Sequence, residues 1–259
     1  MSQPSQVIAE QIDHTLLITI DNPTKKNAFS PQMMHQLAAA LTRLETESSL
    51  WTGVLVASGD DFTAGLDMPK FFGPQAEKNE TPEHYIDPFG LRNQCSKPVV
   101  SAVQGICFTV GIEIALAGDI IIAADNSRFC QMEAKRGIAP LGGAHFRYMS
   151  RAGWGNAMYH LLLCDEFGAE EAYRIGLVQE VVPAGTQKQR ALEIAELINK
   201  NAPMGIQATK MAARRSIAAA EHEGVAAIGD FRERVMNSKD ATEGIQSFIE
   251  RRAANFTGE

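Results

Sequence analysis

Short apolar segments of strand composition alternate with helical segments over residues 1–182, and only helical segments follow. The predicted strands are a hairpin over 6–20, which turns at Asp13-His14, and single strands at 53–58, 99–103, 119–124 and 177–182. The predicted helices are one that Ser30 caps before Pro31, one that Gly176 ends, and four at about 186–200, 204–219, 221–236 and 240–253. The polar, proline-containing segment 69–95 is predicted as a long loop with short helical pieces. Because such alternation is typical of α/β domains, we expect an α/β fold with a C-terminal helical region.

Composition narrows the class of protein. A chain of 259 residues with 45% hydrophobic residues can bury a substantial core, and its formal net charge of −7 disfavours a nucleic-acid surface. No apolar run reaches the roughly 18 residues of a membrane span. The first residues lack the pattern of a secretory signal, and the four cysteines lack metal-binding spacing. We therefore expect a cytoplasmic protein with reduced cysteines and no membrane or nucleic-acid partner.

One carboxylate interrupts an apolar stretch: Glu113 lies within "GICFTVGIEIALAGDI", residues 105–120. Removing an isolated carboxylate from water costs several kcal/mol, so this group must be paired, capped, protonated or used in chemistry. The simplest alternative is an acid in the first turn of a helix. A capping box would require Ser or Thr at the position of Val110, and Thr109 is one residue out of register. The local pattern thus favours a functional carboxylate.

Two further segments have functional and ordinary interpretations. In "FTAGLDMPK", residues 62–70, Gly65 permits close approach of backbone N–H groups to a ligand, but a strand–turn–helix junction has the same pattern. In "RFCQMEAKRGIAPLGG", residues 128–143, Glu133 follows a short strand, and a surface ion pair with Lys135 or Arg136 is the alternative. No zinc-protease, serine-hydrolase or nucleotide-binding motif is present in the sequence.

Taken together, six segments in order resemble the crotonase superfamily, the enoyl-CoA hydratase/isomerase family, over nearly the whole chain. "DNPTKKNAFS" is similar to the family's N-R-P-x-K-x-N-A-L loop, and "GDDFTAGLDM" to its F-x-A-G-x-D segment. "KPVVSAVQGICFTVGIEIALAGDI" resembles the block that contains the family's glycine triplet, and "FCQMEAKRGIAPLGG" the segment with its second glutamate. "AEEAYRIGLVQEVVP" and "EGIQSFIERRAANF" resemble the last two signatures.

The resemblance implies roles for individual residues. The family's oxyanion hole would use the backbone N–H groups of Leu66 and Val110, and its two hydratase glutamates would be Glu113 and Glu133. In hydrating relatives one carboxylate activates water and the other, protonated, delivers a proton to the α-carbon. The resemblance also implies an acyl-CoA binding site, whose residues would be Lys25, Lys26, Ala28, Ala64, Asp67, Met68 and Arg251. Solvated surface is the alternative for its basic residues.

The chain departs from the family pattern at three places. The glycine triplet is Thr109-Val110-Gly111, so a β-branched side chain occupies its middle position and would alter the pocket. The usual Pro-Glu pair is Met132-Glu133. Leu141 stands where dienoyl-CoA isomerases have an aspartate, which disfavours that activity, while simple enoyl-CoA isomerases typically lack an acid at the position of Glu113.

The resemblance implies a crotonase-type spiral of repeated strand–strand–helix turns, with a core domain at 1–200 and a C-terminal helical region at 201–259. That region would mediate assembly into a homotrimer or a dimer of trimers and close the site. The expected activity is hydration of a 2-enoyl-CoA to a 3-hydroxyacyl-CoA, with coenzyme A as part of the substrate and no separate cofactor or metal. The open alternatives are an isomerase, hydrolase or decarboxylase acting on acyl-CoA, or a non-catalytic binding relative.

Overall fold

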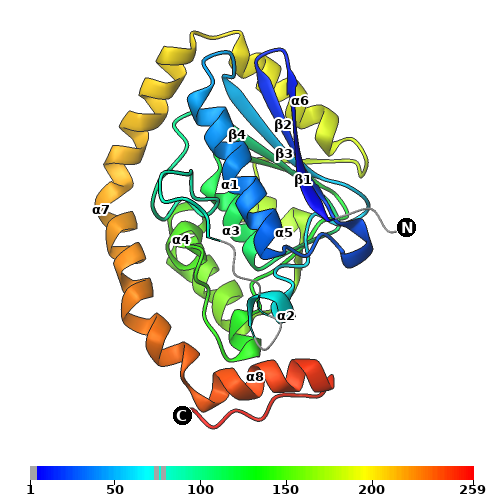
Figure 1. The fold of residues 1–259 in the computed structure, drawn as a ribbon, viewed down its shortest axis with the longest axis vertical. Coiled ribbons are helices and arrows are strands. Elements are labelled where there is room, and N and C mark those ends of the chain that lie inside the picture. Colours follow the sequence, from blue (N-terminus) through cyan, green and yellow to red (C-terminus); the bar gives the residue numbers. More distant parts are fainter. Residues whose placement is uncertain (1–4, 73–75, 77–79) are drawn as a thin grey trace.

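The computed structural model describes residues 5–72, 76 and 80–259. Its larger sheet has six strands, which in spatial order are β1 (Gln6–Ile12), β2 (Thr15–Asp21), β3 (Thr52–Ala57), β4 (Val99–Val103), β6 (Ile120–Ala124) and β9 (Glu180–Val182). Strands β1 to β4 lie beside α1 (Pro31–Thr46) in Figure 1. Strands β1 and β2 form an antiparallel hairpin, and every other neighbouring pair is parallel. The predicted hairpin and α/β class are therefore confirmed.

Two hydrophobic clusters cover the two faces of this sheet. Helix α1 (Pro31–Thr46) packs with Leu16 and Ile18 on one face, while α6 (Gln187–Asn199) packs with Leu17 and its neighbours on the other. Alternate residues of β2 thus point into different clusters, as the pleat of a strand requires. Because helices cover both faces, the central strands are mostly apolar rather than alternating, with Thr52 in β3 and Ser101 in β4 as buried polar exceptions.

A second, three-stranded sheet positions the functional segments. It contains β5 (Ile106–Phe108), β7 (Arg128–Cys130) and β8 (Phe167–Gly168), in that order. Strands β5 and β7 are parallel, with Cys107 opposite Phe129. Because parallel strands end at the same edge, the residues that follow β5 and β7 lie near each other. Helix α3 (Val110–Ala117) follows β5, and the short 3-10 helix η2 (Glu133–Arg136) follows β7.

The remaining helices include the predicted short and C-terminal elements. They are η1 (Pro23–Lys25), α2 (Met68–Phe71), α4 (Ala144–Leu163), α5 (Ala169–Arg174), α7 (Pro203–Met236) and α8 (Lys239–Glu250). Ser30 caps α1 as predicted, since its side chain accepts a hydrogen bond from Met33 N. Within the described ranges no helix is long and apolar enough to cross a membrane.

Three boundaries differ from the sequence prediction. The helices predicted at 204–219 and 221–236 form one continuous α7, because the junction contains no proline or glycine. Gly224 does not interrupt α7; a β-carbon there would lie 2.6 Å from Cδ1 of Phe146, so the glycine allows close packing on α4. The strand predicted at 177–182 is only Glu180–Val182, and the last helix ends at Glu250 rather than at residue 253.

The two C-terminal helices extend away from the body and return to it. Helix α7 runs along one side of the molecule and α8 turns beneath it (Figure 1). Helix α8 contacts η2 at backbone distance: a β-carbon on Gly137 would lie 2.0 Å from the Asp240 carbonyl oxygen. A β-carbon on Gly244 would likewise lie 2.0 Å from the Arg136 carbonyl oxygen. Helix α8 therefore supports the segment directly after Glu133.

Candidate active site

Glu113 lies in the first turn of α3, and its side chain is buried, with 1% of the residue exposed. Its Oε1 accepts hydrogen bonds from Gly142 N at 2.8 Å and from Ala144 N at 3.1 Å. Ala144 is the first residue of α4. The carboxylate therefore caps the N-terminus of a different helix, and not of its own, which is a role that local sequence spacing does not reveal.

The environment of Glu113 holds its pKa near neutrality. Burial raises the pKa of this carboxyl group to about 7, while the hydrogen bonds from Ala144 N and Gly142 N and the charge of Arg147 oppose the shift. Arg147 lies on the other side of Gly142, because its Nη1 donates to the Gly142 carbonyl oxygen at 3.1 Å. Sequence reasoning missed Arg147, which carries no motif of its own.

Glu133 is the first residue of η2, and 8% of it is exposed. Its Oε1 accepts a hydrogen bond from Gln131 Nε2 at 3.1 Å, and its Oε2 is buried without a partner among the described residues. The surface ion pair with Lys135 or Arg136 is not among the ion pairs of the described chain. Glu133 is thus a buried acid with one oxygen free for a ligand.

The charge of Glu113 influences the pKa of Glu133. Burial raises the pKa of Glu133 well above its ordinary value, and the negative charge of Glu113 raises it further. Two backbone N–H groups and the charge of Arg147 stabilise the charged form of Glu113, whereas only a hydrogen bond from its own backbone N–H lowers the pKa of Glu133. As pH rises Glu113 loses its proton first, so a carboxylate and a carboxylic acid coexist around neutral pH.

The segments that contain Leu66 and Val110 meet where α3 begins. Val110 is the first residue of α3, and Leu66 follows Gly65; within the described chain, neither N–H group donates to a protein acceptor. Gly65 has φ 111° and touches Thr109: a β-carbon on Gly65 would lie 2.4 Å from Thr109 Oγ1. Thr109 itself has φ 49°, an uncommon conformation for a β-branched residue. This contact brings the segments of the two predicted oxyanion donors together.

The predicted binding loop at 25–28 is joined to the segment 58–68 by a buried asparagine side chain and by backbone contacts. Asn27 Nδ2 donates to the carbonyl oxygens of Ser58 and Asp61, each at 2.7 Å, and Ala64 N donates to Lys26 O at 2.9 Å. Leu66 also forms a parallel bridge with Phe29. Ala28, Ala64, Asp67 and Met68 therefore belong to one assembled region. Asn27, which sequence reasoning did not single out, has φ 55°, a conformation in which asparagine is enriched.

The basic residues of the predicted binding set differ in their surroundings. Lys25 Nζ lies 2.8 Å from Asp67 Oδ2, and Lys26 Nζ lies 3.9 Å from Asp61 Oδ2. Both lysine side chains are more than half exposed, so they are accessible to an anion but already have carboxylate partners. Arg251 follows α8, and no hydrogen bond or ion pair joins it to the other predicted binding residues in the described chain.

Among the residues that the structure describes, no group of three or more His, Cys, Asp or Glu side chains is placed to hold a metal ion. All four cysteines are buried and unpaired.

Comparison with known proteins places this geometry in a family. The model of the family "Enoyl-CoA hydratase/isomerase" matches residues 11–259. Enoyl-CoA hydratase EchA19 of Mycobacterium tuberculosis is 31% identical over 253 residues, which cover 96% of this chain and 95% of that protein. The 2,3-dehydroadipyl-CoA hydratase of Escherichia coli is 29% identical, over 98% of this chain and 99% of that protein. The 1,2-epoxyphenylacetyl-CoA isomerase of the same organism is 28% identical, over 94% of this chain and 95% of that protein.

Solved structures agree with the sequence comparison. A carnitinyl-CoA hydratase from Mycobacterium avium has a TM-score of 0.90 at 31% identity, over 99% of this chain and 100% of that one. A probable enoyl-CoA hydratase/isomerase from Mycobacterium abscessus has a TM-score of 0.78 at 41% identity, over 98% of both chains. This chain therefore belongs to the enoyl-CoA hydratase/isomerase family and has the crotonase fold that its motifs predicted.

Proposed function

We propose that this protein is an enoyl-CoA hydratase that adds water to a 2-enoyl-CoA and forms the 3-hydroxyacyl-CoA. The observation that carries the proposal is the pair of buried glutamates, whose surroundings favour a carboxylate at Glu113 and a carboxylic acid at Glu133. Hydration needs one group of each kind at the same time, because one must accept a proton and the other must donate one.

The proposed reaction begins with polarisation of the thioester. The N–H groups of Leu66 and Val110 bind the carbonyl oxygen, where negative charge develops as the enolate forms. Two such preorganised donors contribute about 10²–10³ each to the rate, and the position of Val110 at the start of α3 adds the favourable end of that helix's dipole. Since backbone atoms do this work, the side chains of Leu66 and Val110 are free to shape the acyl pocket.

Water then adds across the double bond. The Glu113 carboxylate accepts one proton from the water molecule as its oxygen bonds to C3, and the carboxylic acid of Glu133 gives its proton to C2. The product is the 3-hydroxyacyl-CoA, with Glu113 protonated and Glu133 ionised. After the product leaves, exchange with solvent removes the proton from Glu113 and returns one to Glu133, which restores the starting state. The free, buried Oε2 of Glu133 supports its assignment as the proton donor.

Parallel assays of two amide variants test this mechanism. In Glu113→Gln and Glu133→Gln the shape of the side chain is kept, and each variant should lose hydration by about 10²-fold or more in kcat. Hydration is followed by the absorbance of the conjugated thioester, and conversion of a 3-enoyl-CoA to the 2-enoyl-CoA is measured alongside. Glu196→Gln, on the exposed face of α6, is the matched control and should retain full activity.

The outcomes separate a hydratase from an isomerase. An isomerase needs one base that moves a proton between two carbons, so Glu113→Gln would leave its double-bond migration largely intact. Full hydration by Glu113→Gln refutes the assigned mechanism. Loss of both activities in Glu133→Gln, with only hydration lost in Glu113→Gln, supports it. The double variant should fail non-additively, because the two groups act on one water molecule.

The proposal extends to assembly as a homotrimer or a dimer of trimers. It is supported by large apolar side chains exposed on α4 and α5, among them Leu162 at 74%, Trp154 at 68% and Tyr173 at 57%. Neighbouring subunits would cover such side chains. Sedimentation at micromolar concentration should give a species of three or six chains, and a stable monomer contradicts this part of the proposal.

A further inference from the structure

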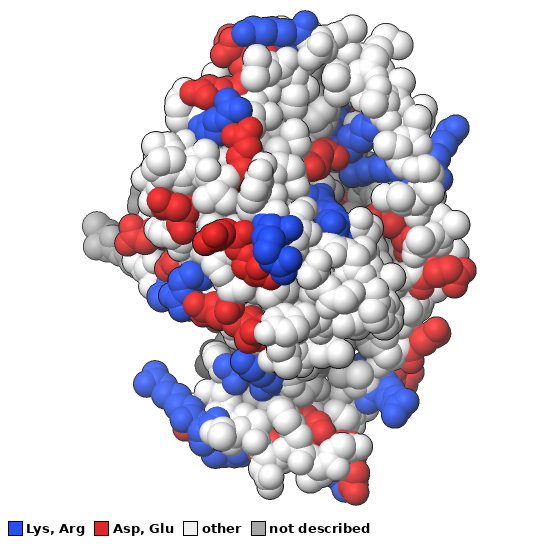
Figure 2. Space-filling view, turned by 180° about the vertical axis from the view of Figure 1, so that it is seen from behind, with Lys and Arg blue, Asp and Glu red and all other residues white. Residues whose placement is uncertain are grey.

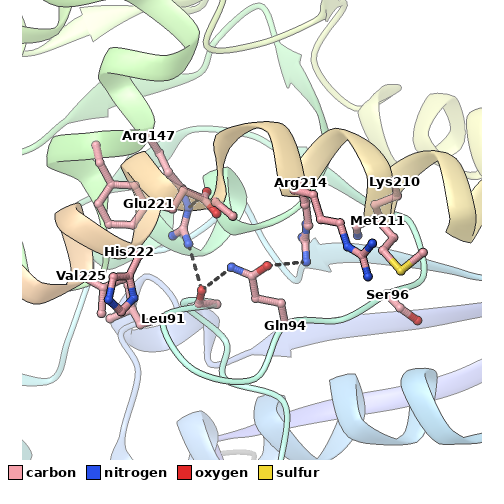
Figure 3. A pocket seen from close by; sticks show the side chains of 14 residues that line it. Leu91, Gln94, Ser96, Arg147, Lys210, Met211, Arg214, Glu221, His222 and Val225 are labelled. Carbon is pink, nitrogen blue, oxygen red and sulfur yellow. Dashed lines mark hydrogen bonds and ion pairs between the residues drawn. The ribbon is translucent and has the colours of Figure 1, made fainter.

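A cavity of about 380 Å³ lies between α7 and the loop that contains Leu91 and Gln94 (Figure 3). It adjoins a second cavity of about 610 Å³, with which it shares lining residues that include Arg147, Lys210 and Arg214. Together they form a hollow beside α7, along which lysine and arginine side chains gather (Figure 2). Neither cavity is lined by Glu113 or Glu133, so the mechanism above does not use them.

The smaller cavity has more positive than negative groups. Arg147, Lys210, Arg214 and Arg215 line it, and Glu221 is its one carboxylate. The carboxylate of Glu221 is 3.9 Å from Arg147 Nε, a long contact for an ion pair. Arg215 forms no hydrogen bond or ion pair with any residue that the structure describes.

Asp119, in the adjoining cavity, neutralises part of this charge. It forms a close ion pair with Lys210 Nζ, at 2.5 Å, and lies 4.0 Å from Arg214 Nη2. Arg214 is otherwise held by Gln94 and the Cys95 carbonyl oxygen, which orient the guanidinium without removing its charge. Burial lowers the pKa of Arg147, and the charges of Arg214 and Arg151 lower it further against the opposing effect of Glu221 and Glu113. An anion in the cavity would relieve this repulsion.

Apolar side chains complete the lining. Leu91, Phe146, Met211, Ala218 and Val225 face the same space as the cations. The site thus suits a ligand with a hydrocarbon portion and an anionic end, rather than a fully hydrated inorganic anion.

A short path connects the cavity to the catalytic carboxylate. Arg147 Nη1 donates to Gly142 O at 3.1 Å, and Gly142 N donates to Glu113 Oε1 at 2.8 Å. One residue therefore separates the guanidinium from the carboxylate, a span of about 10 Å at most from standard backbone dimensions. Phe89 packs against Gly142 beside Glu113, and the next residue, Gly90, lines the cavity and accepts a hydrogen bond from Arg147 Nη2 at 3.3 Å.

We propose that the acyl group of the substrate ends in a carboxylate, which binds in this cavity to Arg147, Arg214 and Arg215. The acyl chain would run from the reacting carbons past Phe89 and place its hydrocarbon portion against Leu91 and Met211. This inference rests on the proposed function, and it defines the substrate class as enoyl-CoA thioesters of dicarboxylic acids.

Matched substrates of equal length test the proposal. Hydration of 2-hexenedioyl-CoA, which carries the terminal carboxylate, should have a kcat/KM about tenfold or more above that of 2-hexenoyl-CoA, which lacks it. Arg215→Gln should reduce the ratio of the two kcat/KM values about tenfold. Arg215 is exposed and makes no described interaction, so its replacement should not affect folding. Arg232→Gln, at an exposed position of the same helix that lines neither cavity, is the control and should leave the ratio unchanged.

Binding measurements separate this inference from the hydratase proposal. Calorimetry with the saturated thioesters adipyl-CoA and hexanoyl-CoA should show tighter binding of adipyl-CoA, with the difference lost in Arg215→Gln. If neither enoyl substrate is hydrated but this difference is found, the cavity assignment stands and the hydratase proposal falls. Equal affinities, or a difference that Arg215→Gln leaves intact, overturn the cavity assignment. Binding of free adipate as tight as that of adipyl-CoA also overturns it, because the cavity would then be a separate anion site.

Discussion

Replacing Glu113 with glutamine should make the folded protein more stable above pH 7 while it removes hydration activity. A carboxyl group whose pKa is higher in the folded than in the unfolded chain destabilises the fold once the pH exceeds the unfolded value. For Glu113 the unfolded value is about 4.5 and the folded value about 7, with burial as the main cause. Glutamine keeps an oxygen that can accept from Gly142 N and Ala144 N but carries no charge to bury.

The magnitude follows from the two pKa values. Below pH 4.5 the group is protonated in both states, so its titration contributes no difference between the wild type and the variant. Between pH 4.5 and 7 the unfolded wild-type chain releases the proton while the folded chain retains it, and stability falls with rising pH. Above pH 7 the accumulated cost is about 3 kcal/mol, or about 6–12 °C in Tm for a chain of this size. Loss of the Glu113 charge also lowers the pKa of Glu133, which adds stability in the same direction.

Denaturant unfolding at fixed protomer concentration, from pH 4.5 to pH 8.5, measures this difference in unfolding free energy. The difference between Glu113→Gln and wild type should change by about 1.4 kcal/mol per pH unit between the two pKa values of Glu113. Any further change above pH 7 should come from the lowered pKa of Glu133 in the variant. Glu196→Gln corrects for the loss of a surface charge. A difference that does not vary with pH refutes the reasoning, because Glu113 would then be ionised in the folded state as readily as in the unfolded chain.

Three further predictions concern the catalytic geometry. Hydration should increase with pH through about 7, as Glu113 ionises, and decrease at higher pH as Glu133 loses its proton; a pH–kcat/KM profile without the acid limb contradicts this. Gly65→Ala should lower kcat about 10²-fold or more, because the new methyl group would meet Thr109 Oγ1 and separate the two N–H donors. The double variant with Thr109→Gly should recover part of this loss in kcat. Val110→Gly should shift the preference for acyl chain length and leave kcat for the best substrate within about tenfold, because the N–H remains; an unchanged preference would mean that Val110 points away from the acyl chain.

Sequence patterns identified the candidate site because its elements are local. Ser30 and Pro31 define the start of α1 through a cap that involves neighbouring residues. Glu113 was identified because a carboxylate inside an apolar run requires an explanation. The family motifs indicated Glu133 as the second carboxylate and Leu66 and Val110 as the backbone donors. These inferences needed only the identity and order of residues close together in the chain.

The features that the sequence did not reveal depend on contacts between distant segments. The two helices predicted at 204–236 form a single α7, because nothing between residues 219 and 221 ends a helix and its glycine packs on Phe146. Strands β5 and β8 are too short to have a recognisable periodicity. The roles of Arg147 and Asn27 arise from hydrogen bonds to backbone atoms of other loops, which a pattern of side-chain types does not encode.

The structural role of Glu113, beside its proposed catalytic role, limits how a protein of this architecture can diverge. Its Oε1 satisfies two buried N–H groups at the start of α4, so replacing it with an apolar residue would leave both donors without an acceptor. A descendant with another activity would first need a substitute acceptor, such as glutamine, a bound water molecule or a rebuilt 142–144 segment. Loss of the proposed catalytic base therefore has a structural prerequisite, and we expect changes of reaction at this site to be accompanied by substitutions in the 142–144 segment as well as at Glu113.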